Sequence, residues 1–276
     1  MSFFDDLELI DQENLDVHIY ELFVNRSRPQ VSHGLGFIER KNGTIEVTVG
    51  DRDILITQDL SQLNSTTQTS STGFVAWKVS PLFFEWLQSP ECKFKERLNQ
   101  NSVVVELGTG IAGIGPAVLG NRTSRYIATD QAHLLKLLKH NVDENTLPVS
   151  KKPTKRSATS SASHSVEVVE FDWEYPNTLD NFKDHIADIG YNGVVIACDT
   201  IYNDYLIPHF VNAVNLVLDT MGPGSMLFLA QQLRSEEILE SALGALISSG
   251  LSCYYIPDYA LSDKLVNGFC VHILSH

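Results

Sequence analysis

The sequence predicts an α/β fold in which a largely parallel sheet is flanked by helices. From residue 102 onward, short apolar runs alternate with amphipathic stretches, which is the order expected of successive βαβ units. The first of these runs, 102–107, holds three β-branched valines and suits a strand that is covered on both faces. It leads directly into a glycine-rich turn, as the first strand of a ligand-binding α/β sheet does.

Each element of this fold follows from its local pattern. Strands are expected at residues 102–107, 125–129, 166–171, 193–198, 225–230, 251–256 and 268–274. Helices are expected at residues 111–119, 131–142, 204–220 and 235–248. In the last helix, Ser235 is the expected N-cap, and apolar residues from Ile238 to Ile247 recur at helical spacing.

The first 71 residues form an N-terminal extension, and residues 72–276 form the main domain. The extension begins with an amphipathic helix, on which Leu15, Ile19 and Leu22 share a face. A hairpin follows, with alternating strands at 44–49 and 53–57 around Gly50-Asp51, and a polar loop covers 61–71. Within the main domain, residues 149–165 combine four basic side chains with many serines, which predicts a disordered insertion.

Composition limits the class of protein. The chain has 276 residues and a net charge of −14, which disfavours nucleic-acid binding and is compatible both with a basic protein partner and with solubility alone. The four cysteines form no C-x-x-C pair, so we expect reduced thiols and no metal site. No apolar run approaches the length of a membrane span, and the N-terminus lacks a signal-peptide pattern. We expect a soluble monomer in the cytoplasm, with the nucleus as the alternative.

The glycine turn is the strongest indication of a ligand. Gly108 and Gly110 allow a tight turn against which a ligand can lie, with Thr109 between them, and Gly113 allows close packing of the next helix. The same spacing also fits a dinucleotide site or a turn that binds nothing. Glu106 favours a ligand with a cationic amino end, and S-adenosylmethionine is such a ligand.

Acidic residues end two of the following strands. Asp130 can accept hydrogen bonds from both hydroxyls of a ribose, and its alternative role is to cap the helix that begins at Gln131. Asp172 can accept from an adenine amino group, and Trp173 can pack on the ring or simply fill the core.

The strand at 193–198 leads into a third acidic position. Because ligands bind beyond the carboxyl ends of parallel strands, Asp199 points to the reaction zone and could hold an ammonium group. Tyr202 could form an aromatic wall beside the amine. The alternative is that Asp199 caps the helix expected at 204.

Together these motifs resemble class I S-adenosylmethionine-dependent methyltransferases, and more narrowly the lysine methyltransferase family with a D-x-x-Y motif. The resemblance covers roughly residues 35–275, with the fungal ribosomal lysine methyltransferases as the most similar group. It is carried by the following stretches: Thr72-Gly73-Phe74-Val75-Ala76-Trp77, Glu106-Leu-Gly-Thr-Gly110, Asp130-Gln131, Asp172-Trp173 and Asp199-Thr-Ile-Tyr202.

This resemblance implies a seven-stranded sheet with an antiparallel last strand, and it implies a role for each matching residue. Gly108, Thr109 and Gly110 would contact the methionine part of the cofactor. Asp130 would bind the ribose, and Trp173 and Asp172 would lie near the adenine. Trp77 and Cys198 would line the pocket, while Asp199 and Tyr202 would guide the substrate lysine.

The function that follows is methylation of a protein lysine, and the resemblance implies a large-subunit ribosomal protein of the L1 stalk as the substrate. Two alternatives remain at this point. One is an inactive cofactor-binding module that serves as an assembly or interaction factor. The other is a nicotinamide-dependent oxidoreductase, which Glu106 and the lack of a tyrosine–lysine acid–base pair disfavour.

Overall fold

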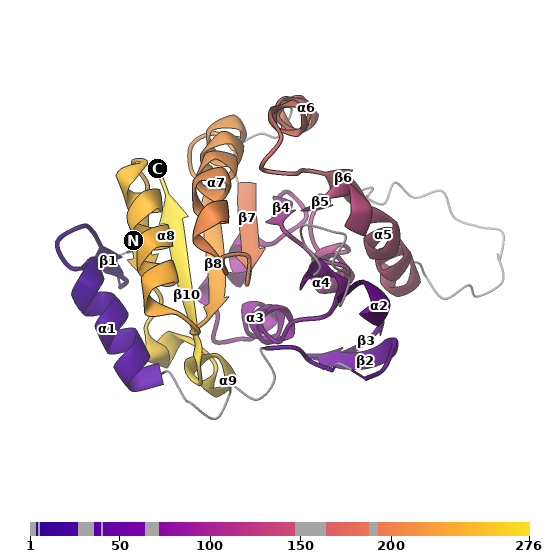
Figure 1. Ribbon diagram of the computed structural model, residues 1–276, viewed down its shortest axis with the longest axis horizontal. Coiled ribbons are helices and arrows are strands. Elements are labelled where there is room, and N and C mark those ends of the chain that lie inside the picture. Colours follow the sequence, from indigo (N-terminus) through magenta and orange to yellow (C-terminus); the bar gives the residue numbers. More distant parts are fainter. Residues whose placement is uncertain are drawn as a thin grey trace.

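The computed structural model describes residues 4, 6–26, 36–39, 41–63, 72–146, 164–187 and 193–276. Within these residues, an eight-stranded sheet runs through the centre of the protein (Figure 1). Its strands are β1 (Glu8–Ile10), β4 (Val103–Leu107), β5 (Arg125–Asp130), β6 (Ser165–Glu170), β7 (Gly193–Cys198), β8 (Met226–Gln232), β9 (Ser252–Tyr255) and β10 (Phe269–Ser275). The spatial order is β1-β9-β10-β8-β7-β4-β5-β6.

The sheet is parallel at its centre and antiparallel at one edge. The strands β8, β7, β4, β5 and β6 run parallel to one another, whereas β10 is antiparallel to both β8 and β9. All seven predicted strands are therefore present, and the last is antiparallel as expected. The eighth strand, β1, adds to β9 at the edge. It was not predicted because three residues are too few to show a strand pattern.

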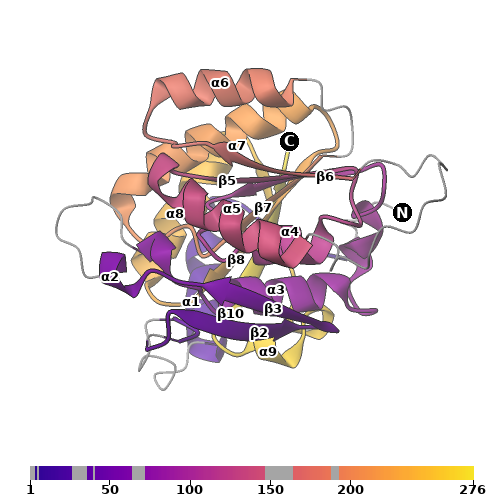
Figure 2. The same cartoon turned by 90° about the vertical axis from the view of Figure 1, so that its right-hand side faces the viewer.

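Helices cover both faces of the sheet (Figure 2). One face packs against α1 (Leu15–Arg26), α6 (Pro176–Ile186), α7 (Ile207–Met221) and α8 (Glu236–Ser248). The other packs against α3 (Val79–Gln88), α4 (Ile114–Leu119), α5 (Ala132–Thr146) and α9 (Asp263–Val266). Successive residues of β4 face opposite layers: Val104 belongs to the second and Val105 to the first. Burial on both faces explains the near-continuous apolar runs in the sequence.

The predicted hairpin packs closely on the rest of the described chain. The hairpin of β2 (Thr44–Val49) and β3 (Arg52–Thr57) has the predicted alternation, and its buried face joins the core beside α3. Two amide side chains of α5, Asn141 and Asn145, hydrogen-bond the backbone of β3. Asn141 also donates to the carbonyl of Ile111 at 2.6 Å, which ties the hairpin to the glycine turn.

Several boundaries differ from the prediction. The helix expected from 111 begins at Ile114, because Gly110 and Gly113 adopt positive φ angles that interrupt the helix before it starts. The helix expected at 204–220 is divided into the 3₁₀ turn η4 (Asp204–Leu206) and α7.

The structure contains several helices that the prediction lacked. Part of the predicted 61–71 loop lies in α2 (Leu60–Leu63), and residues 72–276 add α6, α9, η2 (Thr72–Phe74), η3 (Lys93–Arg97) and η5 (Asp258–Ala260). The proposed insertion at 149–165 lies outside the described residues except for His164 and Ser165, which lead into β6.

Candidate active site

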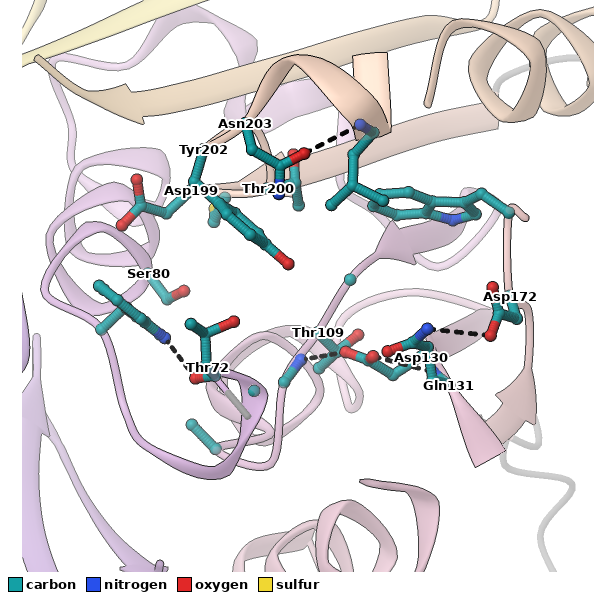
Figure 3. Close-up of a pocket in the computed structure, with 18 of the residues that line it drawn as sticks. Thr72, Ser80, Thr109, Asp130, Gln131, Asp172, Asp199, Thr200, Tyr202 and Asn203 are labelled. Carbon is teal, nitrogen blue, oxygen red and sulfur yellow. Dashed lines mark hydrogen bonds between the residues drawn. The ribbon is translucent and has the colours of Figure 1, made fainter. Parts of the chain in front are cut away.

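A cavity of about 310 Å³ lies where β4, β5 and β7 end, which is the edge of a parallel sheet at which ligands bind. Figure 3 shows Asp130, Gln131 and Asp172 on one side of this cavity, with Asp199, Thr200 and Tyr202 on the opposite side. Thr72, Gly73 and Val75 also contribute to the wall. The residues that the prediction placed at the cofactor and the substrate therefore meet at one cavity, with the exception of Glu106.

The glycine turn presents bare backbone to the cavity. Gly108 has a φ of 65°, and a Cβ atom there would lie 2.9 Å from the Thr200 methyl group and 3.3 Å from the Trp173 ring. Gly110 has a φ of 64°, which side chains rarely adopt. The turn is held from outside, since the amide of Ile111 donates to the carbonyl of Gly73 at 3.0 Å.

Asp130 ends β5 and is held by two backbone amides. The N–H of Gly110 donates to Oδ2 at 2.7 Å, and the N–H of Gln131 donates to Oδ1 at 2.8 Å. Burial raises the pKa of Asp130 to about 6, although the two amides act in the opposite direction. Each oxygen keeps a lone pair for a further donor, so this carboxylate can accept from both hydroxyls of a ribose. Since one bond goes to Gln131, just before α5, the capping role and the binding role are compatible.

Asp172 and Trp173 lie next to Asp130. Gln131 bridges the two acids, because its Nε2 donates to Oδ2 of Asp172 at 2.9 Å. The Trp173 ring approaches Gly108 and meets Phe210 edge-on at 5.2 Å, so it belongs both to the cavity wall and to the core. Among the described residues, its buried Nε1–H has no hydrogen-bond partner.

Asp199 is paired with an arginine. Its side chain is 2 % exposed, and it accepts two hydrogen bonds from the guanidinium of Arg234, one of them from Nη1 at 2.6 Å. The alternative role as a helix cap goes instead to Asn203, whose Oδ1 accepts from the N–H of Leu206 at 3.0 Å. Asp199 has a φ of 60°, a strained angle for a residue with a side chain.

Three other predicted residues line the cavity. Tyr202 is 40 % exposed, and its hydroxyl points into the space between the two sides (Figure 3). The indole N–H of Trp77 donates to the carbonyl of Thr72 at 3.0 Å, which closes the segment on itself. Burial raises the pKa of the Cys198 thiol well above its usual value, so it lines the wall as an uncharged group.

Glu106 lies beneath the glycine turn and does not reach the cavity wall. It is 2 % exposed and accepts a hydrogen bond from the hydroxyl of Tyr126 at 2.7 Å. Burial raises its pKa to about 8, so the carboxyl group holds its proton at neutral pH. The structure thus places Glu106 outside the residues that line the cavity, and its contact with a cationic ligand stays a prediction.

Sequence reasoning missed Arg234 and the bridging amide of Gln131. Arg234 follows β8 by two residues, so the rule that ligands meet the carboxyl ends of strands could have identified it. Its partner could not be identified, because nothing in the sequence pairs residues 199 and 234.

In the part of the chain that the structure describes, no group of three or more histidine, cysteine or acidic side chains is arranged to hold a metal ion. No helix in that part has the length and apolar character needed to cross a membrane. All four cysteines are buried and unpaired.

Comparison with known proteins agrees with this geometry. Residues 56–240 match the family model described as lysine methyltransferase. The "Ribosomal lysine N-methyltransferase 5" of Vanderwaltozyma polyspora is 29% identical, over 92% of this chain and 96% of that protein. The protein of the same name from Zygosaccharomyces rouxii is 30% identical, over 76% of this chain and 74% of that protein.

A relative with another name also matches. The "Diaminohydroxyphosphoribosylamino-pyrimidine deaminase" of Schizosaccharomyces pombe is 30% identical over 74% of this chain, but the match covers 44% of that protein. The family match, the similarity to the Zygosaccharomyces protein and the arrangement of the cavity lead to one conclusion. The chain belongs to the lysine methyltransferase family and is an S-adenosylmethionine-dependent protein-lysine methyltransferase.

Proposed function

We propose that this enzyme methylates a lysine of a large-subunit ribosomal protein, the L1-stalk protein, in the cytoplasm or the nucleus. Support for this substrate comes from the names of the Vanderwaltozyma and Zygosaccharomyces relatives. The net charge of −14 favours a basic partner over a nucleic acid. We further propose that the enzyme acts as a monomer and that it binds its protein substrate without direct contact with nucleic acid.

The side of the cavity at Asp130 fits the cofactor. The bare backbone of Gly108 and Gly110 leaves room for a ligand, and the free lone pairs of Asp130 suit ribose hydroxyls. The unpaired indole N–H of Trp173 offers a donor beside the adenine position. When bound, S-adenosylmethionine supplies a methyl group on a good leaving group, so the protein needs no nucleophile of its own.

The side of the cavity at Asp199 and Tyr202 would orient the lysine. The reaction needs a lysine Nζ that has lost its proton, because only then does the nitrogen carry a free lone pair. In this proposal water takes the proton, Tyr202 bounds the amine with its ring, and Asp199 accepts from an amine N–H. Catalysis comes from alignment and from the exclusion of water.

The observation that carries the proposal is the convergence of Asp130 and the Asp199-x-x-Tyr202 motif on one cavity. The test is transfer of labelled methyl groups from S-adenosylmethionine to large-subunit proteins of a strain that lacks this enzyme. We expect label in one protein, recovered as methyl-lysine. Binding of the cofactor without label in any ribosomal protein would refute the proposed substrate. If no protein at all were labelled, the inactive module would be the better account.

A further inference from the structure

The ion pair between Asp199 and Arg234 lies at the substrate end of the cavity. The buried carboxylate receives both arms of the guanidinium, which is the strongest geometry for such a pair. Asp199 is fixed from behind as well: its N–H donates to the carbonyl of Ala230 at 2.8 Å. The pair therefore joins the end of β7 to the end of β8.

Arg234 has little freedom to leave this position. Its Nη2 also donates to Oε1 of Gln232 at 2.9 Å, and its guanidinium carbon lies 5.2 Å from the centre of the Trp77 ring. A planar guanidinium that stacks on an aromatic ring and binds a carboxylate with both arms is well ordered. These three contacts indicate that the Arg234 side chain stays in the site when the substrate binds and is not displaced by it.

We propose that Arg234 favours the unprotonated form of the substrate lysine by cancelling the charge of Asp199. The inference deepens the proposed function and rests on it, since it takes the Asp199 end of the cavity as the lysine site. Arg234 is thus a positioning residue that acts through Asp199.

The physical reason is the effect of a neighbouring charge on an amine. A lone carboxylate a few Å from an ammonium stabilises the charged form and raises the amine pKa by about 1–3 units. That would hold the lysine in the state that cannot react. With Arg234 in place, the oxygens of Asp199 still accept an N–H from the neutral amine, but the net charge beside it is close to zero. The proton goes to water, and no side chain has to carry it.

Other acidic side chains also line the cavity, and each has a hydrogen-bond partner of its own. Within the lining residues that the structure describes, Arg234 is the one cationic side chain. Asp172 is engaged by Gln131, and Glu174 accepts from the hydroxyl of Tyr205 at 2.8 Å. The remaining titratable groups that face the cavity or Asp199 are Asp130, Cys198, Tyr202 and Cys270.

The test is the pH dependence of kcat with the unmethylated L1-stalk protein and saturating S-adenosylmethionine. Arg234→Gln leaves Asp199 uncompensated, so the rise of kcat with pH should move upward by about one unit. At pH 7 the rate should then be about tenfold lower than wild type, with recovery at high pH. Arg234→Lys keeps the charge and should move the profile less. Arg122→Gln removes an exposed arginine elsewhere and should leave the profile in place.

A double variant separates charge from structure. Asp199→Asn combined with Arg234→Gln restores a neutral pair, so its profile should return to the wild-type position even though the rate is lower. A profile that stays shifted in the double variant would contradict the inference. Melting temperature and S-adenosylhomocysteine binding check that each variant is folded.

A binding measurement gives a second readout. When the substrate binds to the enzyme with S-adenosylhomocysteine at pH 8, calorimetry in buffers of different ionisation enthalpy counts the protons released. Wild type should release more protons than Arg234→Gln. Equal proton release by the two proteins, together with an unshifted pH profile of Arg234→Gln, would overturn the inference. A lower KM of Arg234→Gln with an unshifted profile would also overturn it, because it would show that Arg234 only blocks the lysine site. If wild type itself does not methylate the protein, the proposed function fails, and this inference falls with it.

Discussion

Two carboxylates at neighbouring strand ends of one cavity are held in opposite ways. Asp130, at the end of β5, receives two backbone N–H groups and no cation. Asp199, directly after β7, is bound by both arms of Arg234. The Asp199 side chain is 2 % exposed and Asp130 is half-buried, and the clearest difference between the two carboxylates lies in their partners.

This difference matches what each end of the cavity has to bind. The hydroxyls of a ribose are neutral donors, and a carboxylate that keeps its charge is their strongest acceptor. A substrate lysine must give up its charge before it reacts, and a carboxylate with a paired cation does not oppose that loss. We therefore propose that the cofactor binds on the Asp130 side and the lysine on the Asp199 side.

The largest effect is expected for Asp199→Asn. The change keeps the shape, removes the carboxylate charge and leaves Arg234 unpaired beside the amine. Methyl transfer should fall by about a hundredfold, the loss expected of a misaligned reacting group, while S-adenosylmethionine affinity changes only slightly. Single-turnover rates and calorimetric titration check the two quantities. Wild-type transfer by this variant would remove Asp199 from the lysine site.

Asp130→Ala should act on binding. Removing a charged acceptor costs about 1.5–3 kcal/mol, so affinity for S-adenosylmethionine should fall roughly tenfold or more. Some loss of melting temperature is also expected, because the amides of Gly110 and Gln131 lose their acceptor. Asp180→Ala, at an exposed position on α6, is the matched control and should leave affinity unchanged. Equal affinities for the two variants would break the assignment of Asp130.

A smaller effect is expected for Tyr202→Phe, which keeps the aromatic wall and removes the hydroxyl. A hydrogen bond from this hydroxyl to the bound substrate would be worth about 0.5–1.5 kcal/mol, so its loss should lower kcat roughly two- to tenfold. Tyr175→Phe, at an exposed position outside the cavity lining, serves as the control. A hundredfold loss for Tyr202→Phe would instead give the hydroxyl a part in proton transfer.

The smallest effect on binding is expected for Glu106→Gln, because Glu106 lies outside the cavity wall. Affinity for S-adenosylmethionine should stay within about threefold of wild type, whereas loss of a charge-assisted contact would cost roughly tenfold or more. Stability gives a separate signal. Since the folded pKa is raised to about 8 from 4.5, the folded state keeps a proton that the unfolded state has lost. Wild-type stability should therefore fall as the pH rises through this window.

The glutamine variant should lack that contribution. Its melting temperature relative to wild type should rise between pH 5 and pH 9. A constant difference between the two proteins across this range would show that Glu106 is charged in the folded state.

The sequence predicted the sheet well because each central strand is buried on both faces and reads as an apolar run. It also placed Asp130, Asp199 and Tyr202 near strand ends that border the cavity, since Asp130 and Asp199 directly follow such runs and Tyr202 lies three residues after Asp199. It did not identify the role of Glu106, because a residue at a strand end can point into the cavity or beneath it. The Asp199–Arg234 ion pair could not be predicted from the sequence either, since it depends on β7 and β8 lying side by side.

The division of labour between the two carboxylates can be tested most directly by one measurement. This is the rate of methyl transfer to the L1-stalk protein as a function of S-adenosylmethionine concentration, for Asp130→Ala and Asp199→Asn side by side. We expect the Asp130→Ala rate to approach wild type at saturating cofactor, and the Asp199→Asn rate to remain about a hundredfold low at every concentration. Recovery of Asp199→Asn at high cofactor, or no recovery of Asp130→Ala, would contradict the account.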